Sequence, residues 1–191
     1  MTTQMDLLAT HHKTTTELES QLNHIQGSPS LSGTVEMVVC RPDVGKRREL
    51  TEAELCPQRG LLGDNWLARG YAKGPGGHAH PEMQLNLMNA RAIAAIARDR
   101  QHWKLAGDQF FVDLDLSPAN LPPGTRLQIG TALIEVTAEP HLGCKKFQSR
   151  FGRDAVKFVN SAAGKALNLR GINAKIIQAG MVKPGDSIKK C

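Results

Sequence analysis

Residues 126–144 read RLQIGTALIEVTAEPHLGC. Two apolar stretches, residues 126–129 and 132–137, are separated by a Gly-Thr pair, and this arrangement predicts a tight β-hairpin. A proline and a glycine then break the second strand and lead to Cys144. Residues 147–159 follow with a helical pattern. The stretch therefore predicts a hairpin that delivers a single cysteine close to the start of a helix.

The rest of the chain repeats this pattern of short apolar stretches bounded by Gly and Pro turns. Further strands are predicted at residues 34–40, 46–54, 84–88, 110–116 and 172–179, and helices at 90–98 and 154–166. Because strands and helices do not alternate regularly, a doubly wound sheet is disfavoured. The pattern predicts a mainly β fold, a closed or partly closed β-barrel with a few helical insertions. Most of the predicted strands are expected to share one curved sheet.

The first 32 residues differ from the remainder in composition. Leu18, Leu22 and Ile25 recur at helical spacing before a Gly-Ser-Pro-Ser break. We interpret residues 1–32 as a flexible N-terminal extension that includes a short helix, since chain ends are often poorly ordered. The domain itself is expected to span residues 33–190.

Composition limits the classes of function. The chain has 191 residues, enough for one domain with a full core, and a net charge of +6. Such an excess suits anionic ligands or a basic nucleic-acid-binding module, although only 4% of residues are aromatic, which leaves few platforms for base stacking. The first residues lack the apolar core of a secretory signal, and no apolar run is long enough to cross a bilayer. We therefore expect a cytoplasmic protein with no membrane association and with free thiols.

Cys144 is the candidate reactive residue. A thiol acts as a nucleophile or metal ligand only as the thiolate, which nearby positive charge favours, and Lys145 and Lys146 follow directly. The alternative is a small buried cysteine that closes a strand. The residues of the hairpin alone leave both interpretations open.

Two loops carry further candidate binding residues. Arg59 and Asp64 lie beside glycines that allow close backbone approach to a ligand, but such a pair is also common in a turn with a surface ion pair. His78 and His80 lie in a Gly-rich loop over residues 70–80, and two alternate histidines are too few to define a metal site. We expect these four side chains to gather with Cys144 at one end of the barrel.

Four segments in order resemble the MOSC domain, which is named for the C-terminal domain of molybdenum cofactor sulfurases. They are RGLLGD at residues 59–64, QLNLMNA at 84–90, the stretch from Leu121 to Val136, and EPHLGC at 139–144 with residues 171–186 beyond. The resemblance covers roughly residues 33–190 and implies a β-barrel with a cysteine at its mouth. It implies that Cys144 carries sulfur as a persulfide or ligates the molybdenum of a bound molybdopterin, the molybdenum cofactor. The surrounding residues are then expected to contact that cofactor: Arg59, Asp64, His78, His80, His141, Lys145, Lys146 and Arg170.

This sequence departs from the family pattern at two places. Relatives often carry two cysteines in the turn, where this chain has His141 and a single Cys144. Relatives also often carry Arg-Arg-Asn where this chain has Gly-Asp-Gln at residues 107–109. The second change removes positive charge that would attract an anionic cofactor.

The resemblance leaves two related functions open. A carrier would bind the cofactor or hold sulfur on Cys144, and would need a separate pyridoxal phosphate-dependent cysteine desulfurase, because the chain has no room for one. A molybdenum-dependent reductase of N-hydroxylated compounds would need an electron-transfer protein, because the chain shows no flavin, haem or iron–sulfur motif. Nucleic-acid binding remains the alternative from a different class.

Overall fold

The computed structural model describes residues 12–71 and 75–191. The expected N-terminal extension lies outside the described residues up to position 11, and the glycine-rich loop does so at positions 72–74. The strands are β1 (Ser32–Cys40), β2 (Arg48–Leu50), β3 (Ala53–Cys56), β4 (Gly60–Leu61), β5 (Leu85–Asn89), β6 (Phe110–Asp113), β7 (Arg126–Ile129), β8 (Ala132–Val136), β9 (Ile172–Gln178), β10 (Gly180–Val182) and β11 (Ser187–Lys190). The helices are α1 (Thr15–Glu19), α2 (Leu22–Gln26), α3 (Trp66–Arg69), α4 (Ala90–Ile96), α5 (Lys145–Asn160) and α6 (Ala162–Ala166), with short 3₁₀ helices η2 (Pro75–Gly77), η3 (Pro81–Met83) and η4 (Arg100–Ala106).

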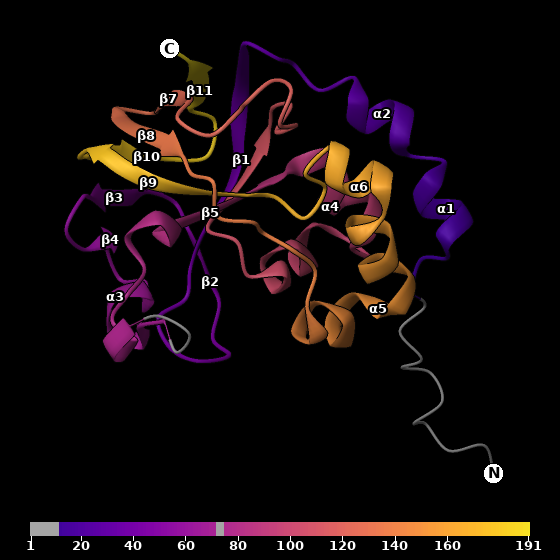
Figure 1. Cartoon of the computed structure of the whole chain (residues 1–191), viewed down its shortest axis with the longest axis horizontal. Helices are drawn as coiled ribbons and strands as arrows, with labels where there is room; N and C mark the ends of the chain where they lie inside the picture. Colours follow the sequence, from indigo (N-terminus) through magenta and orange to yellow (C-terminus); the bar gives the residue numbers. More distant parts are fainter. Residues whose placement is uncertain (1–11, 72–74) are drawn as a thin grey trace.

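Seven strands close into a mixed β-barrel in the order β11-β7-β8-β9-β5-β6-β1, because β1 also pairs with β11 (Figure 1). β2 extends the sheet beyond the second half of β1. The strand pairs are antiparallel except β5 and β6, which are parallel. The expectation of a closed barrel with helical insertions is confirmed. The strands predicted at residues 34–40, 84–88, 126–129, 132–137 and 172–179 share one sheet, as β1, β5, β7, β8 and β9.

The β7–β8 hairpin forms as the sequence predicts. Ile129 pairs with Ala132 in antiparallel register, and Gly130 occupies the turn with φ of 53°. A glycine suits this place, because an added Cβ would lie 2.3 Å from the Met181 carbonyl oxygen. Leu127, Ile129 and Ile134 point into the barrel and are fully buried.

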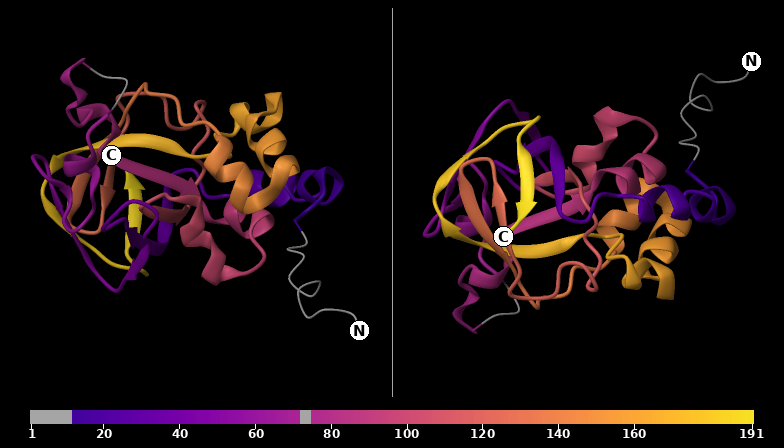
Figure 2. Two further views of the ribbon diagram at one scale, coloured as in Figure 1. Left: turned by 90° about the horizontal axis from the view of Figure 1, so that it is seen from below. Right: turned by 90° about the horizontal axis from the view of Figure 1, so that it is seen from above.

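A second layer of helices covers one side of the barrel (Figure 2). α4, η4 and α5 enclose an apolar cluster that includes Ile93, Trp103, Phe147 and Phe158. β1 contributes to both cores, since Val38 faces the barrel interior while Val39 faces the helices. The helical layer thus places the start of α5 beside the barrel end where β1 finishes and β6 begins.

The helix α5 is bent rather than continuous. Gly152 has φ of 89° and ψ of 170°, which separates two helical segments. The helix predicted over residues 154–166 is also interrupted, because Ser161 is extended and caps α6 through its side chain, which accepts from the Gly164 amide. Each break depends on one residue, a glycine with positive φ or a serine that caps a helix, and the spacing of apolar residues does not indicate either.

The described part of the N-terminal segment packs on this helical layer. Thr14 forms a capping box with Glu17 at the start of α1, and Leu18 is fully buried in the helical core. Ile25 from α2 joins the same core. β1 begins at Ser32. The domain boundary near residue 33 and the flexibility of the extension stay predictions. Over the described residues, none of the helices has the length and apolar character needed to span a bilayer.

Candidate functional site

Cys144 lies at the N-terminus of α5. Its extended backbone makes it the N-cap residue, and its side chain is exposed. Lys145 and Lys146 begin the helix and are also exposed. Amide groups of the first helical turn and the helix dipole give this end of the helix partial positive charge. The alternative of a buried cysteine closing a strand is therefore wrong for Cys144; it applies instead to Cys40, which is fully buried at the end of β1.

The residue before Cys144 is fixed by a side chain from the other end of the same helix. The Gly143 amide donates to Asn160 Oδ1 at 2.9 Å, and Asn160 Nδ2 donates to the Gly143 carbonyl at 3.0 Å. A Cβ on Gly143 would lie 2.8 Å from Val159 Cγ2, so only glycine allows this close approach. The bend at Gly152 makes the contact possible, because it brings the end of α5 back toward its start.

Asp108 holds the cysteine loop to the barrel through a buried ionic cluster. His141 Nε2 lies 2.9 Å from Asp108 Oδ1, and Arg170 Nη1 lies 2.7 Å from Asp108 Oδ2. Arg170 Nη2 also donates to the Ala106 carbonyl, and its guanidinium stacks 4.9 Å from the centre of the Phe147 ring. These contacts join η4, the Cys144 loop and the segment before β9.

Burial and the neighbouring charges together determine the protonation states of Asp108 and His141. Burial alone would raise the pKa of Asp108, but Arg170 and then His141 outweigh it and lower the pKa to about 2. Burial lowers the pKa of His141, and the positive charge of Arg170 lowers it further, against the opposing effect of Asp108. At neutral pH His141 is therefore uncharged, and its Nε2–H donates to the Asp108 carboxylate.

A second buried ion pair lies on the other side of Gly107. The Arg41 guanidinium binds both carboxylate oxygens of Asp64 at 2.9 Å, and the Arg41 amide also donates to Asp64. Arg41 Nη1 continues to Asn86 Oδ1 and to the Gly107 carbonyl. Asn86 in turn donates to Asn173. The pair therefore anchors three strands at this end of the barrel.

Three arginines to which the described residues give no ion pair lie beside Arg41 and Asp64. A carbon placed on Gly107 would lie 3.3 Å from Arg47 Nη2 and 3.8 Å from Arg150 Nη1. Burial lowers the pKa of Arg47, with further lowering by Arg150 and Arg41, and burial and Arg41 lower the pKa of Arg69; the negative charge of Asp64 opposes both shifts without reversing them. Within the described residues, no ion pair neutralises Arg47, Arg69 or Arg150. We call these three residues the arginine cluster.

One atom of this cluster lacks a partner. In the part of the chain that the structure describes, Arg47 Nε is buried and makes no hydrogen bond. An unpaired buried donor is unfavourable, and an anion bound between the arginines would satisfy it. The donor set consists of guanidinium groups, whose planar N–H pairs match phosphate and carboxylate oxygens. The arrangement is therefore chemically suited to an anionic ligand.

The structure brings together some of the residues predicted for the site. Asp64, His141 and Arg170 all join the buried clusters on the two sides of residues 107–108. Their ion pairs hold the loops in place, and their charges are largely satisfied within the protein. This chain departs from the family pattern at residues 107–109 and in the turn that contains His141. The structure pairs Asp108 from the first of these places with His141 from the second.

The remaining predicted residues lie further from these contacts. Arg59 is exposed on the turn between β3 and β4, and His78 is exposed after η2. His80 Nε2 lies 3.8 Å from Glu139 and its ring meets Tyr71 edge-on. Across residues 12–71 and 75–191, no hydrogen bond or ion pair joins Arg59 or His78 to the Cys144 loop, and their roles stay predictions.

Sequence reasoning did not select Arg41, Arg47, Arg69, Arg150 or Asn160. Arg47 belongs to the only basic triplet of the chain, residues 46–48, which is a signal that could have been used. The others are single charged or polar residues within ordinary surface patterns. Their proximity depends on the closure of the barrel and the bend of α5.

The sequence and the fold are similar to those of known proteins. A family model of the MOSC domain matches residues 75–189. The fold is similar to that of YuaD from Bacillus subtilis, with a TM-score of 0.60 and 18% identity over 84% of this chain and 96% of that one. It is also similar to YiiM from Escherichia coli, with a TM-score of 0.53 and 22% identity over 83% of this chain and 69% of that one. The search of curated proteins gave no significant match. The family match covers more than half of the sequence, and the chain therefore belongs to the MOSC domain family.

Proposed function

We propose that this protein binds the molybdenum cofactor, with Cys144 as the sulfur ligand of the metal. The observation that carries the proposal is the arginine cluster: Arg47 and Arg150 meet at Gly107, none of the three arginines forms an ion pair with a described residue, and Arg47 Nε is a buried donor without a hydrogen bond. Arg150 belongs to the same helix whose N-cap is Cys144. A soft thiol and an anion-binding group are therefore held by one helix, and a phosphorylated pterin that carries molybdenum needs both.

The residues present have distinct roles in this proposal. Arg47, Arg69 and Arg150 would hold the anionic phosphate of the pterin, and Cys144 would hold the metal. The bound molybdenum would supply two-electron redox chemistry that the side chains themselves lack. The hydrogen bond between Asp108 and His141 anchors the loop that leads to Cys144, and Asn160 fixes the residue before Cys144. Lys145 and Lys146 add positive charge at the exposed edge.

A sulfur-carrier role for the same cysteine is the second candidate. The exposure of Cys144 supports it, since a persulfide must be passed between two proteins. Under this role the partner would be a cysteine desulfurase, whereas the cofactor-binding role in a reductase would use an electron-transfer protein. A carrier has no use for a phosphate-binding arginine cluster, so the cluster favours cofactor binding.

The experiment is a metal and pterin analysis of protein purified from a host that makes the cofactor. We expect molybdenum and pterin in near-equal amounts in the unmodified protein. Cys144→Ser should lose molybdenum, and Arg47→Gln should lower pterin content at least tenfold, while Lys157→Gln, an exposed charge change on α5, should leave both unchanged. Persulfide on Cys144 without pterin would select the carrier role. Absence of molybdenum, pterin and persulfide would refute both.

A further inference from the structure

Large apolar side chains are exposed on the loops around the candidate site. Residues 12–71 and 75–191 expose five such side chains, and three of them are Val44, Leu67 and Leu142, with exposed fractions of 74%, 52% and 51%. The other two are Leu31, which precedes β1, and Met181 in β10. Single exposed apolar residues are ordinary, but several of them around one site are typical of an interaction surface.

The three loops that carry these side chains are joined by hydrogen bonds. The Asn65 amide before α3 donates to the Arg41 carbonyl at 2.8 Å, which links α3 to the loop between β1 and β2. Arg41 Nη1 donates to the Gly107 carbonyl, and the neighbouring Asp108 binds His141 in the loop before α5. Figure 1 shows the loop between β1 and β2, α3 and the start of α5 along the lower edge of the molecule. The exposed apolar groups therefore belong to one face.

This face carries an excess of positive charge. We call the exposed surface of residues 42–48, 64–69 and 141–146 the cationic face. These segments contain six lysines and arginines and two aspartates. Asp43 lies 3.5 Å from Lys46, and Asp64 is buried against an arginine outside the three segments. The other five cations form no ion pair with any residue that the structure describes: Arg47, Arg48, Arg69, Lys145 and Lys146.

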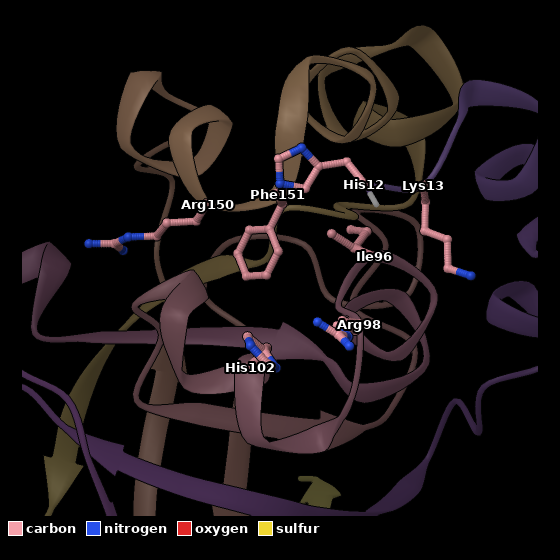
Figure 3. A pocket seen from close by; sticks show the side chains of 7 residues that line it. All are labelled: His12, Lys13, Ile96, Arg98, His102, Arg150 and Phe151. Atoms are coloured by element: carbon pink, nitrogen blue, oxygen red, sulfur yellow. The ribbon is translucent and has the colours of Figure 1, made fainter. Parts of the chain in front are cut away.

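Arg150 adds to this charge from α5. Figure 3 shows its side chain pointing away from the Phe151 ring and from the small cavity that this ring lines. Arg150 Nη1 donates to the Leu105 carbonyl at 2.6 Å, and a carbon placed on Gly107 would lie 3.8 Å from the same nitrogen. Positive charge therefore extends from the exposed loops into the arginine cluster.

Separate apolar groups among cations fit a protein partner whose contact surface is acidic around an apolar centre. Opposite potentials bring two such proteins together, and apolar side chains and arginines are enriched where they touch. Cys144 is itself exposed on this face, so a protein bound there would cover the proposed metal site. Electron-transfer complexes are transient and have small interfaces, which suits a few apolar contacts within a charged rim.

We propose that the cationic face binds a small acidic electron-transfer protein that carries a flavin or an iron–sulfur cluster. Val44, Leu67 and Leu142 supply the apolar contacts, and the surrounding lysines and arginines supply the charged rim. The class of the partner rests on the function proposed for Cys144, because a molybdenum cofactor held there needs electrons from another protein. The position of the face rests only on exposure, charge and the contacts between its loops.

The test is a titration of the ¹⁵N-labelled full chain with oxidised flavodoxin, an acidic flavin protein, followed by NMR at low ionic strength. We expect saturable shifts of the Val44, Leu67 and Leu142 amides. The affinity should fall as sodium chloride is added, because salt screens the charged rim. Val44→Ser, Leu67→Ser and Leu142→Ser should each weaken binding at least threefold. Leu31→Ser and Met181→Ser, which also remove exposed apolar groups, should leave it unchanged.

Charge variants and other probes make the result specific. Lys145→Gln should weaken binding, whereas Lys189→Gln, an exposed charge change on β11, should not. A plant-type ferredoxin tests the iron–sulfur class in the same way. The proposal is overturned if neither redox protein gives saturable shifts, or if the three Ser variants on the face bind as tightly as wild type. Binding of phosphatidylglycerol-containing vesicles through the same side chains, without binding of either redox protein, would assign the face to a membrane instead.

This experiment and the cofactor analysis can fail separately, because the titration measures affinity rather than activity. Protein without molybdenum or pterin that still binds flavodoxin through the three apolar side chains would refute the function proposed for Cys144 and support the binding face. Protein that contains the cofactor but binds neither redox protein would refute the binding face alone.

Discussion

Asn160 holds Gly143 by both of its backbone groups, at 2.9 and 3.0 Å, and thereby connects the last residue of α5 to the residue before its N-cap. Replacing Asn160 with Ala removes both hydrogen bonds. We expect the free energy of unfolding to fall by about 1–3 kcal/mol, as for a pair of partly buried hydrogen bonds. Asn160→Asp keeps the acceptor but not the donor and should have a smaller effect. Urea unfolding measures the stability of both variants. Equal stability of Asn160→Ala and the wild type would show that the two hydrogen bonds to Gly143 do not stabilise the fold.

Asp108 is the only negative charge within hydrogen-bonding distance of Arg170 in the described chain. Asp108→Asn would leave a buried guanidinium without a counter-ion, which should lower stability by about 3–5 kcal/mol. The matched control is Asp113→Asn, because Asp113 pairs with Arg91 at a partly exposed site. That change should lower stability by less than about 1 kcal/mol. Similar losses in the two variants would show that burial of the Asp108 pair is unimportant.

The lowered pKa values predict how stability depends on pH. His141 has a pKa below its ordinary 6.5 in the folded protein, so the unfolded state takes up a proton first as pH falls below 6.5. Stability associated with His141 is therefore full above pH 6.5 and declines below it, by at most about 1.4 kcal/mol per pH unit. Urea midpoints at pH 7, 6 and 5 should fall less in His141→Gln than in wild type. Parallel profiles would argue against a buried neutral histidine.

Asp108 produces a separate effect at lower pH. Its pKa is about 2 in the folded protein, against 3.8 for an ordinary aspartate. The stability that it contributes is present above pH 3.8 and is lost as pH falls toward 2. An acid titration followed by circular dichroism should therefore show wild type unfolding more steeply below pH 4 than Asp108→Asn. A steeper profile for the variant would contradict this sign.

Gly152 combines an unusual backbone conformation with a close neighbour. Its φ is 89°, and an added Cβ would lie 2.7 Å from His12 Cγ. Gly185 has a similar φ of 93° but nothing within 4 Å of that position. Gly185→Ala should therefore show only the backbone penalty of about 1–2 kcal/mol, and Gly152→Ala should lose more. Adding His12→Gly to Gly152→Ala should recover the difference if the contact is the cause, because the His12 Cβ as well as its ring would lie within 2.8 Å of the added carbon.

The four thiols should differ in reactivity. Cys40 is fully buried, Cys56 is partly buried, and Cys144 and Cys191 are exposed. Cys144 should react with iodoacetamide faster than Cys191, because only Cys144 caps a helix and precedes two lysines. Mass spectrometry of partly alkylated protein gives the two rates. Faster labelling of Cys191 would remove the reason for treating Cys144 as activated.

The hairpin at residues 126–137 could be predicted because it depends on neighbours within a few residues. The parallel pairing of β5 with β6 could not, since no local pattern encodes it. The same distinction applies to the site. Cys144 was found from its turn, whereas Asp108 and Arg170 are 62 residues apart and meet only in the folded barrel.

The pairing of β1 with β11 has a consequence for the order of folding. Ser32 pairs with Lys189, so the first barrel strand to leave the ribosome must wait for the last before the ring can close. During synthesis the first half of β1 exposes an unpaired edge, which is a template for association with other nascent chains. We therefore expect the barrel to close late in folding, and later than a barrel whose neighbouring strands follow one another in sequence.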